Sequence, residues 1–215
     1  MLVQIAERVY NGILLTFYWR LFMNKSAAVF IFLLIFGMSL MPAQTSDSPA
    51  LRPIIHNFSA NNNTGFTTQP VTRTELDLIV QAGLRAPSAG NRQPWLITVV
   101  QNVGLAQQIL PQATEGNILI VVSGAIDGPN RDAVILDCGL TAQNMFIAAQ
   151  AMGLGARQFT NNALITRANN LKTQLGIPAD HTAIIVTRVG RMPAGVDAVS
   201  SASPRANPDQ KVVYR

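Results

Sequence analysis

The chain has 215 residues, of which 48% are hydrophobic and 13% are charged, so it can form one well-buried domain but hardly two. The formal net charge is +5, yet no long Lys/Arg run is present, and no nucleic-acid partner is expected. Cys138 is the single cysteine, which excludes an intramolecular disulfide and, with only two histidines, argues against a zinc site. We expect Cys138 to be a small core residue.

An apolar run near the N-terminus indicates export. Residues 26–41 (SAAVFIFLLIFGMSLM) are short for a membrane span and typical of a signal-peptide core, with Asn24 and Lys25 as a weakly basic flank. Met23 is a candidate start. We therefore expect an exported protein, periplasmic or membrane-anchored in a bacterial context, and a cytoplasmic one only if this segment is misread.

These features divide the chain into four parts. They are an upstream extension or membrane segment (1–22), a signal peptide or uncleaved anchor (23–43), a polar linker (44–56) and a single domain (57–215).

Helical and strand patterns alternate within the domain. Thr72 and Glu75 form a capping-box sequence ahead of apolar residues at helical spacing, which predicts a helix that ends before Pro87. The elements expected next are a strand at 96–100, a short helix at 103–110, a strand at 117–122, a long helix at 131–152, a brief strand at 156–159, a helix at 165–175 and a strand at 182–189.

The long helix is expected at the centre of the fold, because it has few charges and Gly153 supplies its stop. Its apolar residues follow the helical period: Val134, Cys138, Ala142, Met145, Ala149 and Met152. Strands and helices interleave without an internal repeat. We predict an α+β or mixed α/β fold with a central mixed sheet flanked by helices.

The loop at 85–95, RAPSAGNRQPW, allows two interpretations. In one, Pro87 ends a helix, Gly90 supplies a positive φ, and Ser88 and Asn91 satisfy freed backbone groups. In the other, the small residues and polar donors let the backbone approach a flat polar ligand closely. The loop alone does not decide between them.

Two segments together resemble the nitroreductase family of flavin enzymes. APSAGNRQPW (86–95) is similar to the family's APSxxNxQPW loop, and DCGLTAQNMFIAAQAMGLGA (137–156) to its D-x-G-x-A-x-Q-N-x-x-L-A-A-x-x-x-GLG helix. FTTQPV (66–71) and VGRMP (189–193) are similar to the family's segments before the first helix and after the last core strand. The resemblance spans nearly everything from residue 57 to the C-terminus.

This resemblance implies an intertwined homodimer that holds FMN at the subunit interface. It also implies a ping-pong oxidoreductase, in which hydride passes from NADH or NADPH to flavin N5 and then to a nitroaromatic, quinone or similar small-molecule acceptor. Because the flavin carries the chemistry, no catalytic side chain is expected. The implied cofactor-binding residues are Pro87, Ser88, Ala89 and Asn91 in the loop, Asn62 and Thr64 ahead of it, Thr160 near flavin N5, and Arg205 at the phosphate.

The chain departs from the family pattern just before Phe66. The family usually reads R-R-S-x-R-x-F there, whereas this chain reads ANNNTGF, with Asn62 in place of the serine and Thr64 in place of a basic residue. Charge-assisted hydrogen bonds to phosphate are roughly twice as strong as neutral ones, so FMN affinity should fall unless other cations compensate. The resemblance also implies the loss of a cation near flavin N1 that would stabilise the anionic reduced flavin, so the reduction potential should fall as well. The available substitutes are Arg52, Arg73, Arg85, Arg92 and Arg205.

The missing arginines keep a second hypothesis open, namely an exported binding domain that retains the scaffold but has lost FMN and redox activity. A flavin-consuming member of the same superfamily is a third. Asp137 is interpreted as a polar group satisfied near the sheet edge or dimer interface. His56 and His181 are given no catalytic role, because neither has an evident Ser or Cys partner.

Overall fold

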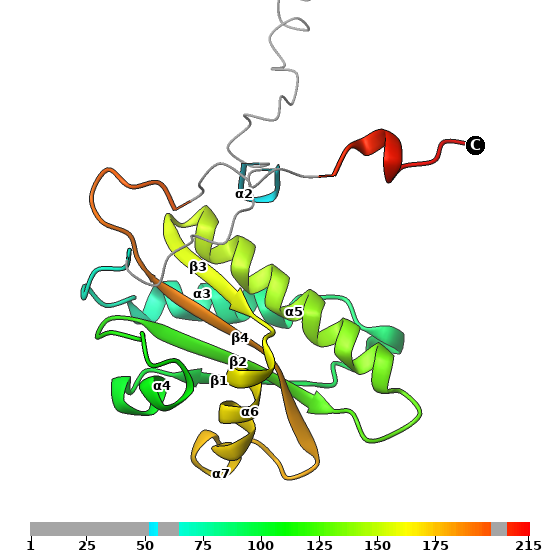
Figure 1. The fold of residues 1–215 in the computed structure, drawn as a ribbon, viewed down its shortest axis with the longest axis horizontal. Coiled ribbons are helices and arrows are strands. Elements are labelled where there is room, and N and C mark those ends of the chain that lie inside the picture. The colour runs from blue at the N-terminus through cyan, green and yellow to red at the C-terminus, as the bar shows by residue number, and fades with distance from the viewer. Residues whose placement is uncertain (1–51, 56–64, 199–205) are drawn as a thin grey trace, which may run out of the picture. The chain divides into compact units, whose positions relative to one another are not determined.

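The computed structural model describes residues 52–55, 65–198 and 206–215 (Figure 1). The predicted signal peptide or anchor therefore lies outside the described residues, as do Asn62, Thr64 and Arg205. Within the described ranges, no helix is both long enough and apolar enough to cross a bilayer. The same ranges contain no cluster of three or more His, Cys, Asp or Glu side chains able to hold a metal ion.

Between residues 73 and 191 the helices and strands follow the predicted order, with one predicted helix divided in two, whereas the short helix at 52–55 and the two 3₁₀ turns were not predicted. The described elements are α2 (Arg52–Ile55), α3 (Arg73–Leu84), the 3₁₀ turn η1 (Ala89–Asn91), β1 (Trp95–Val100), α4 (Val103–Ile109), β2 (Ile118–Ala125), α5 (Arg131–Ala151), β3 (Leu154–Phe159), α6 (Asn162–Asn170), α7 (Lys172–Leu175), β4 (His181–Arg191) and η2 (Pro208–Gln210).

Two boundaries differ from the sequence prediction for identifiable reasons. The single helix expected at 165–175 is two helices, because α6 begins early, where the Asn161 side chain accepts a hydrogen bond from the Leu164 N–H at 3.0 Å, and ends before Leu171. β3 begins at Leu154 rather than 156. Gly153 ends α5 with a φ of 76°, as predicted, and the chain enters the sheet immediately afterwards.

The four strands form one sheet in the order β1-β2-β4-β3, which confirms the α+β class (Figure 1). All three described pairs are antiparallel, whereas the sequence analysis expected a mixed sheet. The antiparallel arrangement results from the connection between β2 and β3. β2 and β3 run in the same direction and are joined through α5, but β4 lies between them and is antiparallel to both.

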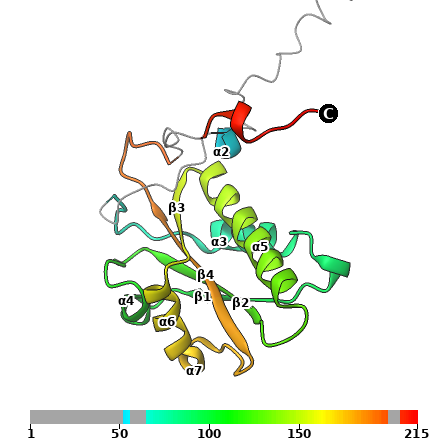
Figure 2. The ribbon, with the colours of Figure 1, turned by 45° about the vertical axis from the view of Figure 1, so that its right-hand side comes forward.

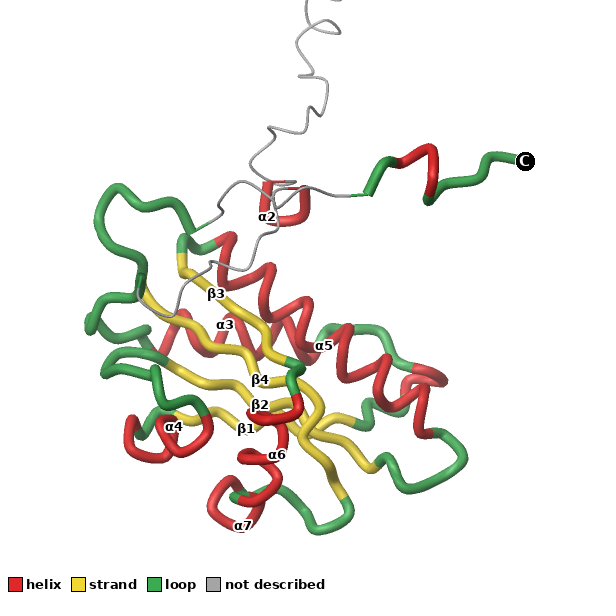
Figure 3. Tube along the Cα trace, viewed as in Figure 1, coloured by secondary structure: helices red, strands yellow, loops and turns green. Residues whose placement is uncertain are grey.

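Helices cover both faces of the sheet. Figures 2 and 3 show α3 and α5 on one face and α4, α6 and α7 on the other. Three residues of β2, Ile118, Ile120 and Val122, face α3 and α5, whereas Leu119 and Val121 face α4, α6 and α7. Burial on both faces explains why this strand appears in the sequence as a continuous apolar run.

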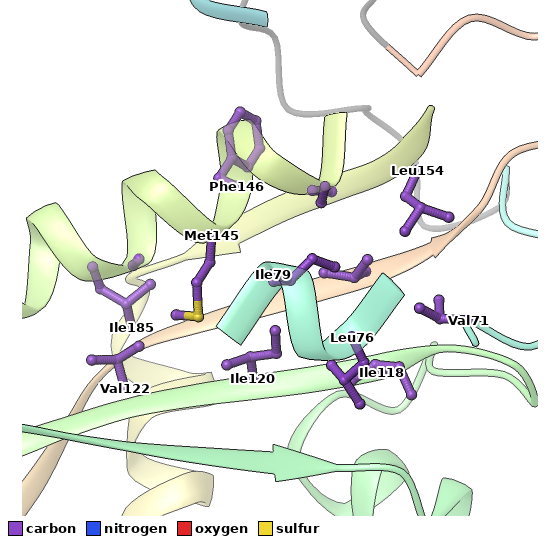
Figure 4. Close-up of a cluster of buried hydrophobic side chains, with 14 of the residues drawn as sticks. Val71, Leu76, Ile79, Ile118, Ile120, Val122, Met145, Phe146, Leu154 and Ile185 are labelled. Atoms are coloured by element: carbon purple, nitrogen blue, oxygen red, sulfur yellow. The ribbon is translucent and has the colours of Figure 1, made fainter. Parts of the chain in front are cut away.

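The core on the α3/α5 face fixes the long helix against the sheet. Met145 of α5 is fully buried and points toward the strands beside Ile79 of α3 (Figure 4). Gly83 lies so close to Met145 that a Cβ there would come within 2.7 Å of the Met145 Cγ. α3 and α5 therefore pack closely against each other as one layer, and the loop leaves α3 beside this contact.

The predicted capping box at the start of α3 is confirmed. The Thr72 hydroxyl accepts the Glu75 N–H at 3.3 Å, and the Glu75 carboxylate accepts the Thr72 N–H at 2.8 Å. Arg191 of β4 donates to the same carboxylate at 2.7 Å. Burial acts to raise the Glu75 pKa, but these hydrogen bonds from Thr72 and Arg191 prevail and hold it below the usual 4.5.

Glu75→Gln should destabilise the fold by about 1 kcal/mol at neutral pH, because the amide lacks the charge that Thr72 and Arg191 bind. The Glu75 pKa is lowered in the folded state, so its contribution is complete above pH 4.5 and is lost as the pH falls through the folded value. Urea unfolding should therefore show the two proteins converging at low pH. A gap that is independent of pH contradicts this account, and Asp77→Asn, in an exposed pair with Arg73, is the control.

Candidate functional site

The loop between α3 and β1 has an unusual backbone. Gly90, Asn91 and Gln93 have φ values of 60°, 54° and 48°, all in the left-handed region. Glycine adopts this region freely and asparagine tolerates it, but for glutamine it costs free energy. The structure therefore holds these residues in a conformation that the chain would not adopt alone.

Hydrogen bonds within the loop close it into a tight turn. The Ser88 carbonyl accepts the Asn91 N–H at 2.9 Å, and the Ser88 hydroxyl oxygen accepts the Gln93 N–H at 3.0 Å. Arg92 donates from Nε to the Ala89 carbonyl at 3.0 Å. Each of these bonds spans five residues or fewer, so they shape the loop without fixing its position on the domain.

A buried carboxylate attaches the loop to the long helix. The Ala89 N–H donates to both carboxylate oxygens of Asp137 at 3.2 Å, and Asp137 lies in the N-terminal half of α5. Asp137 is thus a satisfied polar group, as predicted, and its partner is the loop. This contact joins the two sequence segments that carry the family resemblance.

The loop presents polar donors around an open backbone. A Cβ built on Gly90 would have no atom within 4 Å, and Ala89, Asn91 and Arg92 are exposed. The Asn91 side-chain oxygen accepts from Gln93 Nε2 at 3.2 Å, which leaves its NH₂ group as a donor. Ser88 retains its hydroxyl hydrogen, and Arg92 brings a positive charge. The arrangement suits a flat ligand that carries acceptors along an edge.

The flanking motifs pack together at the other end of the sheet. A Cβ on Gly155 or Gly190 would come within 2.4 or 2.8 Å of the Phe66 ring, so both positions require glycine. Arg188 lies over the same ring, 4.5 Å from its centroid, and donates from Nε to Asn117 at 2.7 Å. Burial, and then the nearby charge of Arg157, lowers the Arg188 pKa to about 10. These contacts pack the segment around Phe66 against the sheet and form no part of the candidate site.

The structure brings together only some of the predicted cofactor residues. Pro87, Ser88, Ala89 and Asn91 share the loop next to β1, whereas Thr160 directly follows β3 and is exposed. β1 and β3 are opposite edges of the four-stranded sheet, separated by roughly 14 Å at the usual strand spacing. Within one chain, the loop and Thr160 therefore do not line a single small site.

The arginines that could replace the family's missing basic cluster differ in their surroundings. Arg52 pairs with Asp197, and Arg73 pairs with Asp77. Arg85 is exposed just after α3, and Arg92 lies in the loop itself. Among the described substitutes, Arg92 is therefore the best-placed cation for a ligand on the loop. The sequence alone does not rank Arg92 above the others, because the pairing of Arg52 with Asp197 is a contact between distant residues.

Two potentially reactive groups lie inside the domain. Cys138 is fully buried, and burial, followed by the charge of Asp137, raises its pKa to about 12. Ser123 has its hydroxyl 3.5 Å from His181 Nδ1, a partner that the sequence analysis did not find for this histidine. Since Ser123 is also fully buried, this contact offers no nucleophile to a substrate.

Comparison with known proteins decides the family. The model of the nitroreductase family matches residues 65–123 and 115–191, which together cover more than half of the chain. The chain belongs to the nitroreductase family. The resemblance inferred from the loop and the long helix is confirmed.

Related proteins agree with this assignment. The chain is 28% identical over 153 residues to a protein of Archaeoglobus fulgidus named as an NADH dehydrogenase or NAD(P)H nitroreductase, covering 67% of this chain and 87% of the relative. It superimposes on nitroreductase A of Vibrio parahaemolyticus with a TM-score of 0.62 and 24% identity, over 76% of this chain and 75% of the other.

Two further nitroreductase-fold structures are named for their cofactors. The NADPH:FMN oxidoreductase of Vibrio harveyi, in complex with NAD⁺, matches with a TM-score of 0.60 and 24% identity over 76% of each chain. A nitroreductase of Desulfitobacterium hafniense with bound FMN matches with a TM-score of 0.59 and 18% identity, over 76% of this chain and 98% of the other. At these identities the likeness establishes a shared fold.

The Cys138 thiol should be unreactive in the folded nitroreductase domain, because a pKa of about 12 and complete burial leave almost no accessible thiolate. Labelling with a thiol-specific chromogenic disulfide at pH 8 should give no signal in buffer and one equivalent in denaturant. Rapid labelling of the native protein contradicts the burial of Cys138.

Proposed function

We propose that this chain is an FMN-dependent NAD(P)H oxidoreductase of nitroreductase type. The observation that carries the proposal is the loop at 88–93, which offers an open backbone at Gly90 between the Ser88, Asn91 and Arg92 donors. Support comes from the family match and from relatives whose names include NAD(P)H nitroreductase, NADPH:FMN oxidoreductase and bound FMN.

The residues of the loop fit the chemistry of this cofactor. Ser88 and Asn91 would donate to polar atoms on the edge of the isoalloxazine ring, and the exposed Gly90 backbone leaves room for its face. The positive charge of Arg92 would favour a phosphate or an electron-rich reduced ring. Bound FMN would supply hydride transfer from NADH or NADPH to a quinone, nitroaromatic or similar acceptor. The proposed role of Thr160 is a backbone N–H toward the same ring.

We further propose that the active form is a homodimer, as the resemblance implies. The loop and Thr160 lie at opposite sheet edges, so a site that uses both is completed by a second chain. α3 and α5 also present a surface with large apolar side chains among the polar ones, with Leu78, Leu84 and Leu136 exposed by 49%, 50% and 63%. Such a surface is typical of an interface.

Export of the domain is proposed on the apolar run at 26–41, with either a cleaved signal or a membrane anchor. Fractionation of cells that express the full chain tests this. A protein found only in the cytosol contradicts it.

The purified protein should be yellow and release FMN on heating, because the loop presents donors and a cation to the ring. Added FMN should raise the melting temperature, by an amount equivalent to about 2.7 kcal/mol at a hundred times Kd, and the protein should oxidise NADH or NADPH with a quinone or nitroaromatic acceptor. Absorbance spectra, thermal shift and consumption of the nicotinamide check the three parts.

Asn91→Gly is a suitable matched variant. Glycine keeps the left-handed φ of 54° accessible and removes only the side-chain amide, so the variant should fold normally and bind FMN more weakly. A colourless wild-type protein whose melting temperature and NAD(P)H oxidation do not respond to FMN contradicts the proposal. That result favours the alternative of a binding domain without redox activity.

Leu136→Lys should shift the protein from dimer toward monomer, because it replaces the most exposed leucine of α3 and α5 with a charge. Size-exclusion chromatography with light scattering measures the mass. Val196→Lys, at a residue 50% exposed after β4, is the control. A wild-type protein that is monomeric at all accessible concentrations contradicts the dimer.

A further inference from the structure

We propose that Asp137 is the positioning residue of the flavin-binding loop. Its buried carboxylate holds the Ala89 N–H and thereby fixes the backbone of residues 88–93 in the conformation that receives the ring. The inference rests on the proposed function of this loop as the FMN site.

The burial of Asp137 requires a reason. Only 3% of the residue is exposed, and burying a carboxylate is costly unless it is paired or well hydrogen-bonded. In the part of the chain that the structure describes, no Lys, Arg or His forms an ion pair with Asp137, and the Ala89 N–H is the donor to both of its oxygens. The Asp137 carboxylate thus interacts mainly with one peptide group of the loop, the Ala89 N–H.

The loop in turn depends on this attachment. Among the described residues, the bond to Asp137 is the one hydrogen bond that connects residues 88–93 to a distant element of the fold. The other bonds of the loop are local, and three of its residues have left-handed φ values. Without the carboxylate, the loop keeps its internal turn but loses its described hydrogen bond to α5.

The attachment also determines what the loop offers a ligand. Because the Ala89 N–H is engaged by Asp137, the donors left for the ring include the Gly90 N–H and the side chains of Ser88, Asn91 and Arg92. Arg92 binds the carbonyl of the same residue, so Asp137 and Arg92 bond to the two peptide groups that flank Ala89. The negative charge beneath the loop opposes the addition of electrons to a bound flavin.

Asp137→Ala and Asp137→Asn in the full chain test this role. Asparagine retains an acceptor oxygen without the charge, so it should weaken FMN binding about tenfold, and alanine should weaken it further, as expected for loss of a charged hydrogen bond. Asp137→Asn should also raise the flavin reduction potential, because a nearby negative charge is removed. Fluorescence quenching gives the Kd, and dye-equilibrated reduction gives the potential.

Hydrogen exchange of the apo-protein provides a readout that does not require FMN. The Ala89 amide should exchange faster in Asp137→Ala, while amides of the sheet should stay protected. Two controls separate this effect from its alternatives. Asp132→Asn removes an exposed charge from the same helix, and Cys138→Ala perturbs the adjacent core position without touching the loop.

The outcomes distinguish the two proposals. If Asp137→Ala and Asp137→Asn bind FMN as tightly as Cys138→Ala does, with unchanged potential and unchanged exchange at Ala89, the positioning role is overturned. If the wild-type protein binds no FMN, the proposed function fails together with the cofactor part of this inference. Faster exchange at Ala89 would then support Asp137 as the anchor of the loop alone, and unchanged exchange would overturn that as well.

Discussion

The hydrogen bond between the Asp137 carboxylate and the Ala89 N–H is the contact on which the candidate site depends. α5 is fixed against the sheet by the fully buried side chains of Cys138, Met145 and Ala149, so the carboxylate has a defined position. Through it, the packing of the core determines where an otherwise self-contained turn sits. The chemistry proposed for the loop therefore depends on residues that no ligand would touch.

Sheet order is the second constraint. The loop leads into β1 at one edge, and Thr160 follows β3 at the other, with β2 and β4 between them. A single chain thus presents two partial surfaces. The exposed leucines of α3 and α5, Leu136 among them, give a physical reason for the proposed second chain. In the proposed homodimer, each chain would supply the part of the site that the other lacks.

Local sequence predicted much of this fold. The capping box of Thr72 and Glu75, the period of α5 and the apolar run of β2 each depend on neighbouring residues, and each was placed within a few positions. Contacts between distant residues were harder to predict. The position of β4 between β2 and β3, which makes the described sheet antiparallel, follows from tertiary packing and leaves no periodic signal.

The site shows the same division. The loop residues Ser88 and Asn91 were identified from their resemblance to a family pattern, and the structure places them together. The hydrogen bond between Asp137 and Ala89 was not predicted, although Asp137 opens the second segment that carries the resemblance, because a separation of 48 residues in sequence carries no geometric information. Arg92 emerged as the loop cation only when its competitors Arg52 and Arg73 were found paired with carboxylates.

Titration of ¹⁵N-labelled protein with FMN tests the central claim most directly, because it reports on each backbone amide as the ligand binds. The account predicts that the largest shifts fall on the amides of residues 88–93, with Ala89 remaining protected from exchange by its bond to Asp137. Saturation with FMN that leaves these amides unmoved, or shifts confined to other elements, would contradict it.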